Sequence, residues 1–215
     1  MRGTRKKGSG FPFGRQLKMS YYPIFLDLRG RPCLVVGGGA IATRKVEGLL
    51  QAAASVTVIS PEITEVIRNY ADAGELRHIK RPYRHGDLGG YFLAYAATGV
   101  AEVDALMAAE ASMAGVLLNV VDRPVLCDFI TPAVIRRGDI SIAISTNGRC
   151  PGFAKRVRRE LEALIGSEYG AALESVAAQR EKLLQGDGTD QSERHERIEK
   201  ALDQAWNALR AGSKS

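Results

Sequence analysis

The chain has 215 residues, of which 45% are hydrophobic and 25% are charged, with a formal net charge of +6 at pH 7. A chain of this length can hold one domain plus a smaller one, and these proportions are ordinary for a globular protein. No apolar run approaches the roughly 18 residues of a membrane span. The three cysteines are odd in number and widely spaced, which predicts neither a disulfide framework nor a zinc site. We therefore expect a cytoplasmic protein.

The net positive charge comes from the N-terminal segment. Residues 1–18 hold six basic residues and no acidic one, so the rest of the chain is neutral overall. Such a segment can bind nucleic acid or an anionic membrane. We favour the alternative, a disordered basic extension ahead of a domain that begins near Met19, and expect neither nucleic acid nor a membrane as a partner.

A glycine-rich turn lies between a predicted buried strand at 34–36 and a predicted helix at 43–54. Residues 33–42 read CLVVGGGAIA, which fits the pattern G-x-G-x-x-G/A of dinucleotide-binding turns. A bare α/β turn would also contain glycines. The second strand predicted at 55–59 supplies the strand–turn–helix–strand order that the dinucleotide fingerprint requires, and this order favours the binding site.

Each small residue of the turn has a physical role in such a site. Gly37 permits the tight turn, Gly39 lets the backbone approach a pyrophosphate, and Ala42 lets the helix pack close to the strand. The helix N-terminus offers free N–H groups and partial positive charge. The predicted cofactor contacts from this turn are Gly37, Gly38, Gly39, Ala40 and Ile41.

Glu62 is the candidate for a contact to the adenosine ribose. It follows the second strand with Ser60 and Pro61, about 20 residues beyond the glycines, where an acid commonly binds the ribose hydroxyl of NAD. No arginine lies beside it to accept the 2′-phosphate of NADP, so NAD is expected. Pro61 and Glu62 could instead start the next helix, and both roles can hold together.

Polar residues follow the predicted core strands where each strand ends. The remaining elements of this domain are three strands and a helix, predicted at 76–81, 91–97, 116–121 and 101–114. In open α/β sheets, ligands bind outside the carboxyl ends of the strands. Gly37, Ser60, Thr98 and Asp122 all fall at such ends, so we expect them to form one site, with Thr98 contacting the cofactor.

Asp122 is the candidate general base. It is the only carboxylate at the end of a core strand beside the expected nicotinamide position, and a base must lie within hydrogen-bond reach of the proton it takes. An aspartate before Arg123-Pro124 can equally form a turn, and spacing alone leaves the two roles even. None of the three histidines pairs with a carboxylate or cysteine at ligand spacing, so no metal site is expected.

After residue 129 the pattern changes. Two strands are predicted at 129–135 and 140–145, joined through 136–139, followed by a helix that Pro151 opens, with Phe153, Val157, Leu161 and Leu164 on one face. Two further helices are predicted at 168–184 and 193–209, the latter around Ile198, Leu202, Ala205 and Leu209, with a polar linker at 185–192.

Residues 136–159 hold seven basic residues against Asp139 alone. Such a run is usually a solvated face, and it would equally bind an acidic small molecule; nucleic acid is disfavoured because no aromatic residues interleave with the basic ones.

Five ordered motifs resemble those of precorrin-2 dehydrogenases, which also form the N-terminal module of sirohaem synthase. The resemblance covers roughly residues 20–185. The motifs are PIF at 23–25, VGGGAIATRK at 36–45, NVVD at 119–122, FITP at 129–132, and STNG at 145–148 followed by Pro151. The chain departs from the family at Gly99-Val100, where an acid or amide often follows the threonine, and at Ala40, where an acid is common.

The resemblance implies an NAD-dependent oxidation of precorrin-2 to sirohydrochlorin, sometimes followed by Fe²⁺ insertion. It implies that Asp122 is catalytic, that Thr146 lies at the substrate site, and that the protein is a homodimer whose middle strands and helix cross between subunits. The basic run would then face a polycarboxylate tetrapyrrole. The substrate-binding candidates are Asn119, Thr146, Asn147, Gly148 and Arg149. No methyltransferase module is expected in 215 residues.

The predicted fold is α/β. We expect an NAD-binding Rossmann domain over 19–131, a small strand–helix dimerisation region over 132–165 and a helical C-terminal region over 166–215. The alternative function is a non-catalytic NAD(H)-sensing Rossmann module. Asp122 and the basic second half favour the enzyme, because a sensor needs neither.

Removing residues 1–18 should change neither the melting temperature nor the turnover of the protein, because short basic extensions of low complexity rarely pack on a domain. Calorimetry and an oxidation assay on the full-length and truncated chains test this expectation. A large loss of melting temperature after truncation would show that the segment belongs to the fold.

Overall fold

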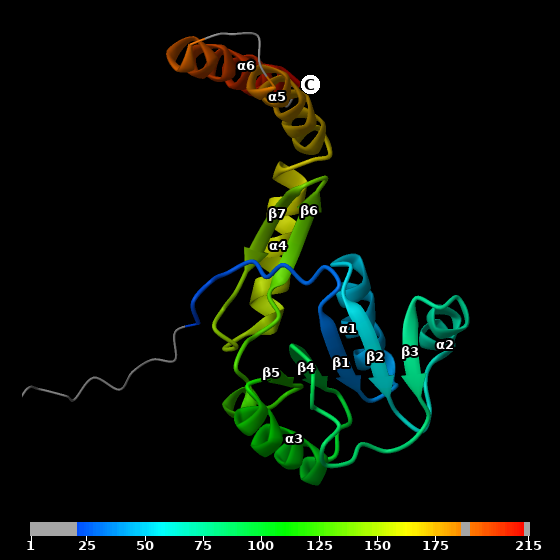
Figure 1. The fold of residues 1–215 in the computed structure, drawn as a ribbon. Helices are drawn as coiled ribbons and strands as arrows, with labels where there is room; N and C mark the ends of the chain where they lie inside the picture. The colour runs from blue at the N-terminus through cyan, green and yellow to red at the C-terminus, as the bar shows by residue number, and fades with distance from the viewer. Residues whose placement is uncertain (1–20, 186–189, 213–215) are drawn as a thin grey trace, which may run out of the picture. The chain divides into compact units, whose positions relative to one another are not determined.

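The computed structural model describes residues 21–185 and 190–212, so the predicted basic extension at 1–18 lies outside the described residues. The chain divides after Phe129 into two compact units, which are described separately (Figure 1). The expected dimerisation and C-terminal regions both fall in the second unit. None of the helices in the described ranges is long and apolar enough to cross a membrane.

The first unit contains a sheet of five parallel strands. Its spatial order is β3-β2-β1-β4-β5, and every neighbouring pair is parallel. The sheet therefore extends in both directions from β1, as in a Rossmann fold, where ligands bind at the point of reversal. The strands are β1 Pro32–Val36, β2 Ser55–Ile59, β3 Leu76–Ile79, β4 Leu93–Ala96 and β5 Leu117–Val120. The predicted fold class is confirmed.

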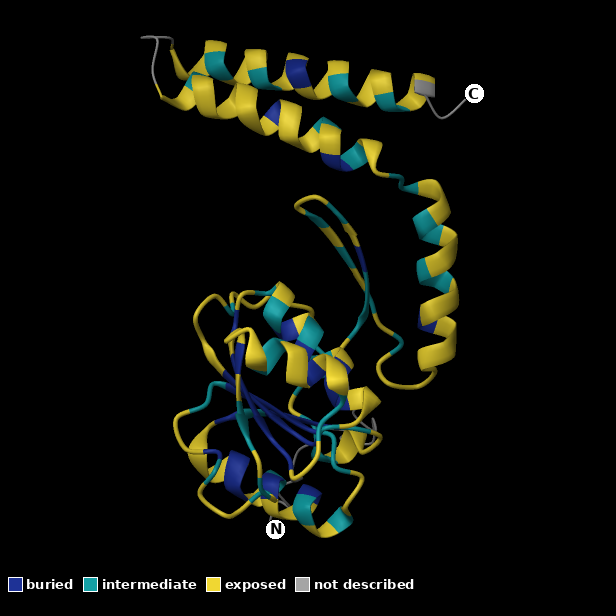
Figure 2. Ribbon diagram, turned by 90° about the vertical axis from the view of Figure 1, so that its right-hand side faces the viewer, coloured by how far each residue is buried: buried dark blue, intermediate teal, exposed yellow. Residues whose placement is uncertain are grey.

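Helices cover both faces of this sheet, as expected for strands that are apolar on both sides. The helices of this unit are α1 Ala40–Gln51, α2 Glu65–Asp72 and α3 Ala101–Ala114. Val46 of α1 and Ile67 of α2 pack with Val35 on one face, and Met107 of α3 packs with Leu34 on the other. Figure 2 shows the strands as buried between the helices.

α1 begins earlier than predicted, and α2 begins after Pro61 and Glu62, which were considered as an alternative start of that helix. α1 starts at Ala40, directly after the glycines and before the predicted residue 43. It ends at Gln51, before Ala53, whose φ of +54° belongs to a turn, so the predicted end at residue 54 is wrong. α2 starts at Glu65, with the Thr64 hydroxyl accepting from the Ile67 N–H. Pro61 and Glu62 therefore do not start the helix; they lie in the loop between β2 and α2, at the carboxyl end of β2.

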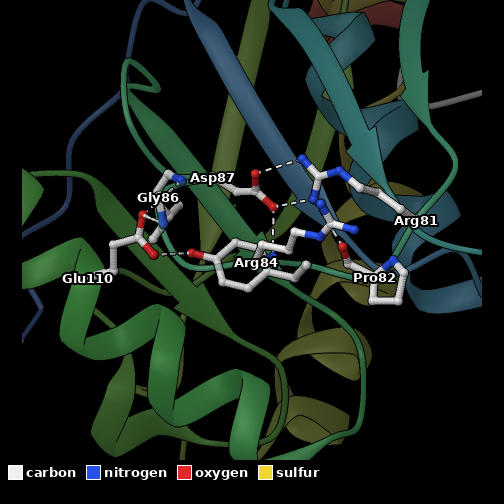
Figure 3. Close-up of polar contacts among 8 residues, drawn as sticks. Arg81, Pro82, Arg84, Gly86, Asp87 and Glu110 are labelled. Carbon is white, nitrogen blue, oxygen red and sulfur yellow. Dashed lines mark hydrogen bonds and ion pairs between the residues drawn. The ribbon is translucent and has the colours of Figure 1, made fainter.

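A polar network fixes the long loop between β3 and β4 (Figure 3). Glu110 of α3 accepts hydrogen bonds from the Tyr83 hydroxyl at 2.6 Å and from the N–H groups of Gly86 and Leu88 at 2.9 and 3.0 Å. Asp87 accepts from both terminal nitrogens of Arg81 at 2.6 and 2.7 Å. The loop is thereby held on the sheet face that α3 covers, where Leu88 is fully buried.

The second unit begins with a two-stranded antiparallel sheet, β6 Ala133–Arg137 and β7 Ile140–Ile144, closed by a two-residue turn at Gly138 and Asp139. The prediction of a strand from residue 129 is wrong, because Phe129 stacks edge-on against Tyr95 of the first unit at 5.4 Å. The prediction that Arg136 and Arg137 join the strands is also wrong, since both lie within β6.

Three helices complete the second unit: α4 Pro151–Leu164, α5 Glu168–Leu184 and α6 Gln191–Gly212. Arg137 donates from its guanidinium to the carbonyls of Ile165 and Glu162 at 2.7 and 3.2 Å, at the end of α4. α5 and α6 lie side by side (Figures 1 and 2). The rings of Tyr169 and Trp206 pack edge to face, with their centroids 6.3 Å apart.

Two predicted apolar faces are only partly buried in this unit. Val157 and Leu161 of α4 are half-buried, but Phe153 is 61% exposed and Leu164 is 70% exposed. On α6 the inward residues include Ala201, whereas Leu202, predicted on the apolar face, is exposed. A surface of this kind is typical of a helix that packs against a further partner.

The loop network makes stability depend on pH. Burial alone would raise the pKa of Glu110, but its hydrogen bonds from Tyr83, Gly86 and Leu88 lower it below the ordinary 4.5; the paired Arg81 lowers the pKa of Asp87 below 3.8. A carboxyl group whose pKa is lower in the folded than in the unfolded state stabilises the folded protein. This contribution is complete at pH values above the unfolded-state pKa and is lost as the pH falls through the folded-state pKa. The contribution should therefore be complete above about pH 5 and disappear towards lower pH.

Glu110→Gln should destabilise the protein by about 1–3 kcal/mol at pH 7, because the amide nitrogen cannot accept from Tyr83. It should also remove part of the loss of stability between pH 5 and pH 3. Urea denaturation at both pH values measures this, with Glu75→Gln, an exposed carboxylate in the turn before β3, as the control. Equal pH dependence in wild type and Glu110→Gln would contradict the role given to Glu110.

Candidate functional site

The glycine turn is packed backbone against backbone on the loops that follow β2 and β4. A Cβ atom at Gly37 would overlap the carbonyl of Ala97, and one at Gly38 would overlap the carbonyl of Glu62. Gly37 also has a φ of +119°, which disfavours any residue with a side chain. The turn therefore brings Glu62 and the end of β4 beside the start of α1.

Gly39 differs from its two neighbours. A Cβ there would have no atom within 4 Å, and Gly39 has the ordinary φ of −83° at the N-cap of α1. No side chain caps this N-terminus, and its first turn holds no acidic residue. Open space and uncapped N–H groups at Gly39, Ala40 and Ile41 fit the pyrophosphate of a dinucleotide.

The loop after β2 is held against this turn by short polar contacts. The N–H of Thr64 donates to the carbonyl of Gly38 at 2.9 Å, and the hydroxyls of Thr43 and Thr64 are 2.8 Å apart. The Ser60 hydroxyl donates to the carbonyl of Glu62 at 2.6 Å. Pro61 and Glu62 thus lie at the end of β2 beside the glycines, where a ribose contact was predicted.

A cavity of about 240 Å³ lies where α1 begins and where β4 and β5 end. Ile41 and Asp122, predicted on separate grounds for cofactor and catalysis, both line it. The other lining residues are Ala97, Gly99, Asp104, Val121 and Arg123. Of the four predicted strand-end residues, Asp122 lines this cavity; Gly37, Ser60 and Thr98 are not among its lining residues, although both chain neighbours of Thr98 are.

Asp122 is exposed and has a φ of +60°, a conformation in which Asp and Asn are several-fold enriched among residues with side chains. The turn is closed by the N–H of Arg123 donating to the carbonyl of Val120 at 3.2 Å. Below it, the Cys127 sulfur accepts from the Val120 N–H at 3.2 Å and lies within donating distance of the Arg123 carbonyl, at 3.3 Å. Burial raises the pKa of the Cys127 thiol, which keeps this sulfur a neutral hydrogen-bonding group.

Lys45 adds a positive charge near Asp122. Its Nζ lies over the ring of Tyr95, 4.9 Å from the centroid. Burial, and then the charge of Arg44, lower the pKa of Lys45, while the negative charge of Asp122 opposes that shift. Lys45 had no predicted role, although it lies in the second turn of the helix that follows the glycines.

Thr98 and Asn119 are both engaged within the protein. The Thr98 hydroxyl donates to Asp104 at 3.2 Å and accepts from the Val100 N–H at 3.0 Å. Asn119 is buried, and its amide donates to the carbonyl of Phe129 at 2.8 Å. The predicted contact of Thr98 with the cofactor and that of Asn119 with the substrate remain predictions. Asp104, buried and on the cavity wall, was missed because its position near the start of a helix is ordinary for an exposed acid.

The remaining predicted substrate residues form a turn before α4 in the second unit. The Thr146 hydroxyl donates to the carbonyl of Cys150 at 3.0 Å and accepts from its N–H at 3.2 Å. Asn147 and Gly148 have φ values of +52° and +74°, and the Arg149 N–H donates to the carbonyl of Thr146 at 3.0 Å. The turn is well formed by itself, and its exposed side chains include Arg149.

Two family models match consecutive parts of the chain. Residues 24–133 match a family described as putative NAD(P)-binding, and residues 137–164 match one described as sirohaem biosynthesis protein central. A siroheme synthase of Methylobacillus flagellatus is 42% identical over 82% of this chain and 38% of its own length. One of Nitrosomonas europaea is 43% identical over 78% of this chain and 35% of its own length. The chain thus spans less than half of these relatives.

A solved structure is also similar. SirC, precorrin-2 dehydrogenase, superposes with a TM-score of 0.73 at 27% sequence identity, covering 89% of this chain and 100% of that chain.

The contrast between neighbouring glycines gives a direct test of the cofactor site. Gly39→Val should fold normally, because nothing lies within 4 Å of its Cβ, and should lose NAD⁺ binding, because the side chain would occupy the pyrophosphate position. Gly38→Ala should instead lower the melting temperature, since its Cβ would overlap the Glu62 carbonyl. Calorimetric titration and thermal melts separate the two effects, and unchanged NAD⁺ affinity in folded Gly39→Val would refute the assignment.

Proposed function

We infer the function of this chain from one premise: the chain belongs to the putative NAD(P)-binding family, whose model covers residues 24–133. Siroheme synthases and a precorrin-2 dehydrogenase are similar to it. We propose that it oxidises precorrin-2 to sirohydrochlorin with NAD⁺ in the cytoplasm. The cavity that joins Ile41 of the cofactor turn to Asp122 carries this proposal.

The chain's own residues bind and orient the reactants. The open backbone at Gly39 and the uncapped start of α1 would hold the pyrophosphate, and Glu62 the ribose hydroxyls. Bound NAD⁺ supplies the hydride acceptor. Oxidation of the macrocycle also releases a proton, and a carboxylate oxygen of Asp122 would accept it at the cavity wall.

The second unit would bind the acidic substrate. Two of its seven basic residues are used internally: Arg137 at the end of α4, and Arg158 with Glu162. The others are exposed: Arg136, Arg149, Lys155, Arg156 and Arg159. Guanidinium groups bind carboxylates in a fork geometry, which suits a polycarboxylate tetrapyrrole. Asn119, Thr146, Asn147, Gly148 and Arg149 are the proposed substrate contacts.

We further propose a homodimer in which the second unit pairs with its copy. The exposed Phe153 and Leu164 of α4 support this, since a large apolar residue on a solvated helix costs free energy unless a partner covers it. Fe²⁺ is proposed as a second substrate, for insertion into sirohydrochlorin. Among the described residues, no group of three or more His, Cys, Asp and Glu side chains could hold a metal ion, so iron would enter as a reactant.

Purified protein mixed with precorrin-2 and NAD⁺ should produce the absorption of sirohydrochlorin. A non-catalytic NAD(H)-sensing module, the alternative function, would bind NAD⁺ by calorimetry and leave the spectrum of precorrin-2 unchanged. This pair of measurements decides between the two functions.

Asp122→Asn should keep NAD⁺ affinity and the melting temperature while turnover falls about 10²–10⁴-fold, the usual contribution of a positioned acid–base group. Asparagine tolerates the φ of +60° at this position and makes the same turn bonds, whereas Asp122→Ala would add backbone strain. Asp72→Asn, at an exposed position at the end of α2, is the control. Near-normal turnover in Asp122→Asn would leave Asp122 as a turn-forming residue only. Iron insertion by the same variant shows whether the two reactions share this carboxylate.

A further inference from the structure

Asp104 connects two loops of the proposed site. Its Oδ1 accepts from the Thr98 hydroxyl at 3.2 Å, and its Oδ2 lies 3.3 Å from Nε of Arg123. Thr98 follows β4, and Arg123 directly follows Asp122 at the end of β5. One carboxylate in the first turn of α3 therefore joins the loop proposed to contact the cofactor to the turn that carries the proposed base.

The exposures of the two charged partners are unequal. Asp104 is 3% exposed, whereas the side chain of Arg123 is 43% exposed. A buried carboxylate is costly unless it is paired and hydrogen-bonded, and the start of a helix also favours negative charge. Arg123 is thus paired with a buried carboxylate, and it lines the cavity together with Asp122.

Glu110 provides an internal comparison on the same helix. It is also a buried carboxylate of α3 that fixes a loop, but its partners are Tyr83, Gly86 and Leu88 in the loop before β4. Asp104 lines the cavity, and both of its side-chain partners belong to the segments at that cavity. Both residues are thus buried carboxylates of α3, but only Asp104 of the two contacts the segments at the proposed site.

We infer that Asp104 is a positioning residue for the oxidation: through Arg123 and Thr98 it fixes the Asp122 carboxylate relative to the cofactor-binding loop. The inference depends on the proposed function. Asp122 lies in a turn with a φ of +60°, and its orientation is set by bonds on either side of it. On one side is Val120, bonded to Cys127, and on the other Arg123, bonded to Asp104. Loss of the charge at Asp104 releases one of these two constraints.

Asp104→Asn keeps the size of the side chain and an oxygen for the Thr98 hydroxyl, and it removes the charge that holds Arg123. We expect kcat to fall about 10–100-fold, as for displacement of a reacting group by about 1 Å, while the Kd for NAD⁺ stays within about threefold. Glu110→Gln is the matched control: its melting temperature falls and its kcat does not. Steady-state kinetics, calorimetric titration and thermal melts of the same preparations give the three readouts.

Arg123→Gln and the double variant Asp104→Asn/Arg123→Gln complete the test. If the pair acts as one unit, the double variant loses no more kcat than the worse single variant. Wild-type kcat in folded Asp104→Asn, or strictly additive losses, would overturn the positioning role. If Asp104→Asn does not fold, Arg123→Gln, altered at a half-exposed side chain, must show the same fall in kcat, and an unchanged kcat overturns the role. If the wild-type protein does not oxidise precorrin-2, the proposed function and the inference are both rejected. If the wild type is active and Asp104→Asn is equally active, the inference alone is rejected.

Discussion

The contact on which the site depends is the packing of backbone on backbone at Gly37 and Gly38. Neither position has room for a Cβ, because the carbonyls of Ala97 and Glu62 fill that space. Three strand ends, those of β1, β2 and β4, therefore approach more closely than any side chain would permit. The same approach leaves Gly39 facing open space at the uncapped start of α1. Two glycines thus build the turn, and the third keeps it accessible to a ligand.

The outer edge of β5 is the second constraint, because β5 is the last strand of the sheet and an open edge leaves N–H and C=O groups unpaired. Here the chain folds back after the Asp122 turn, and side chains occupy that edge. Asp128 accepts from the Leu118 N–H at 2.9 Å and Cys127 from the Val120 N–H at 3.2 Å, while Asn119 donates to the Phe129 carbonyl at 2.8 Å. The Cys127 sulfur also lies 3.3 Å from the Arg123 carbonyl, so it contacts both ends of the turn at 120–123. The segment that protects the sheet edge therefore also holds the turn that carries Asp122.

Much of this architecture follows from local pattern. The helices at 101–114 and 168–184 have the predicted bounds, the five core strands occur where apolar runs predicted them, and the family resemblance is confirmed by the comparisons. The predicted strand ends also place Gly37, Thr98 and Asp122 after β1, β4 and β5, at the same edge of the parallel sheet. The errors arose where tertiary contacts override local preference. Phe129 reads as part of a strand but packs on Tyr95. No prediction was made for Asp104 and Glu110, because their burial depends on partners such as Arg123 and Tyr83, which lie 19 and 27 residues away in the chain.

A module that only senses a dinucleotide requires the glycine turn, the uncapped helix and a residue for the ribose. This chain also places a side-chain residue at positive φ and buries a carboxylate beside the same cavity. Backbone strain of this kind costs about 1–3 kcal/mol and persists only where the surroundings over-determine it, and a buried carboxylate requires its partners to be in place. Neither feature strengthens binding of a pyrophosphate at Gly39. Both would restrict where the Asp122 carboxylate lies, as the proposed transfer of a proton to that carboxylate requires.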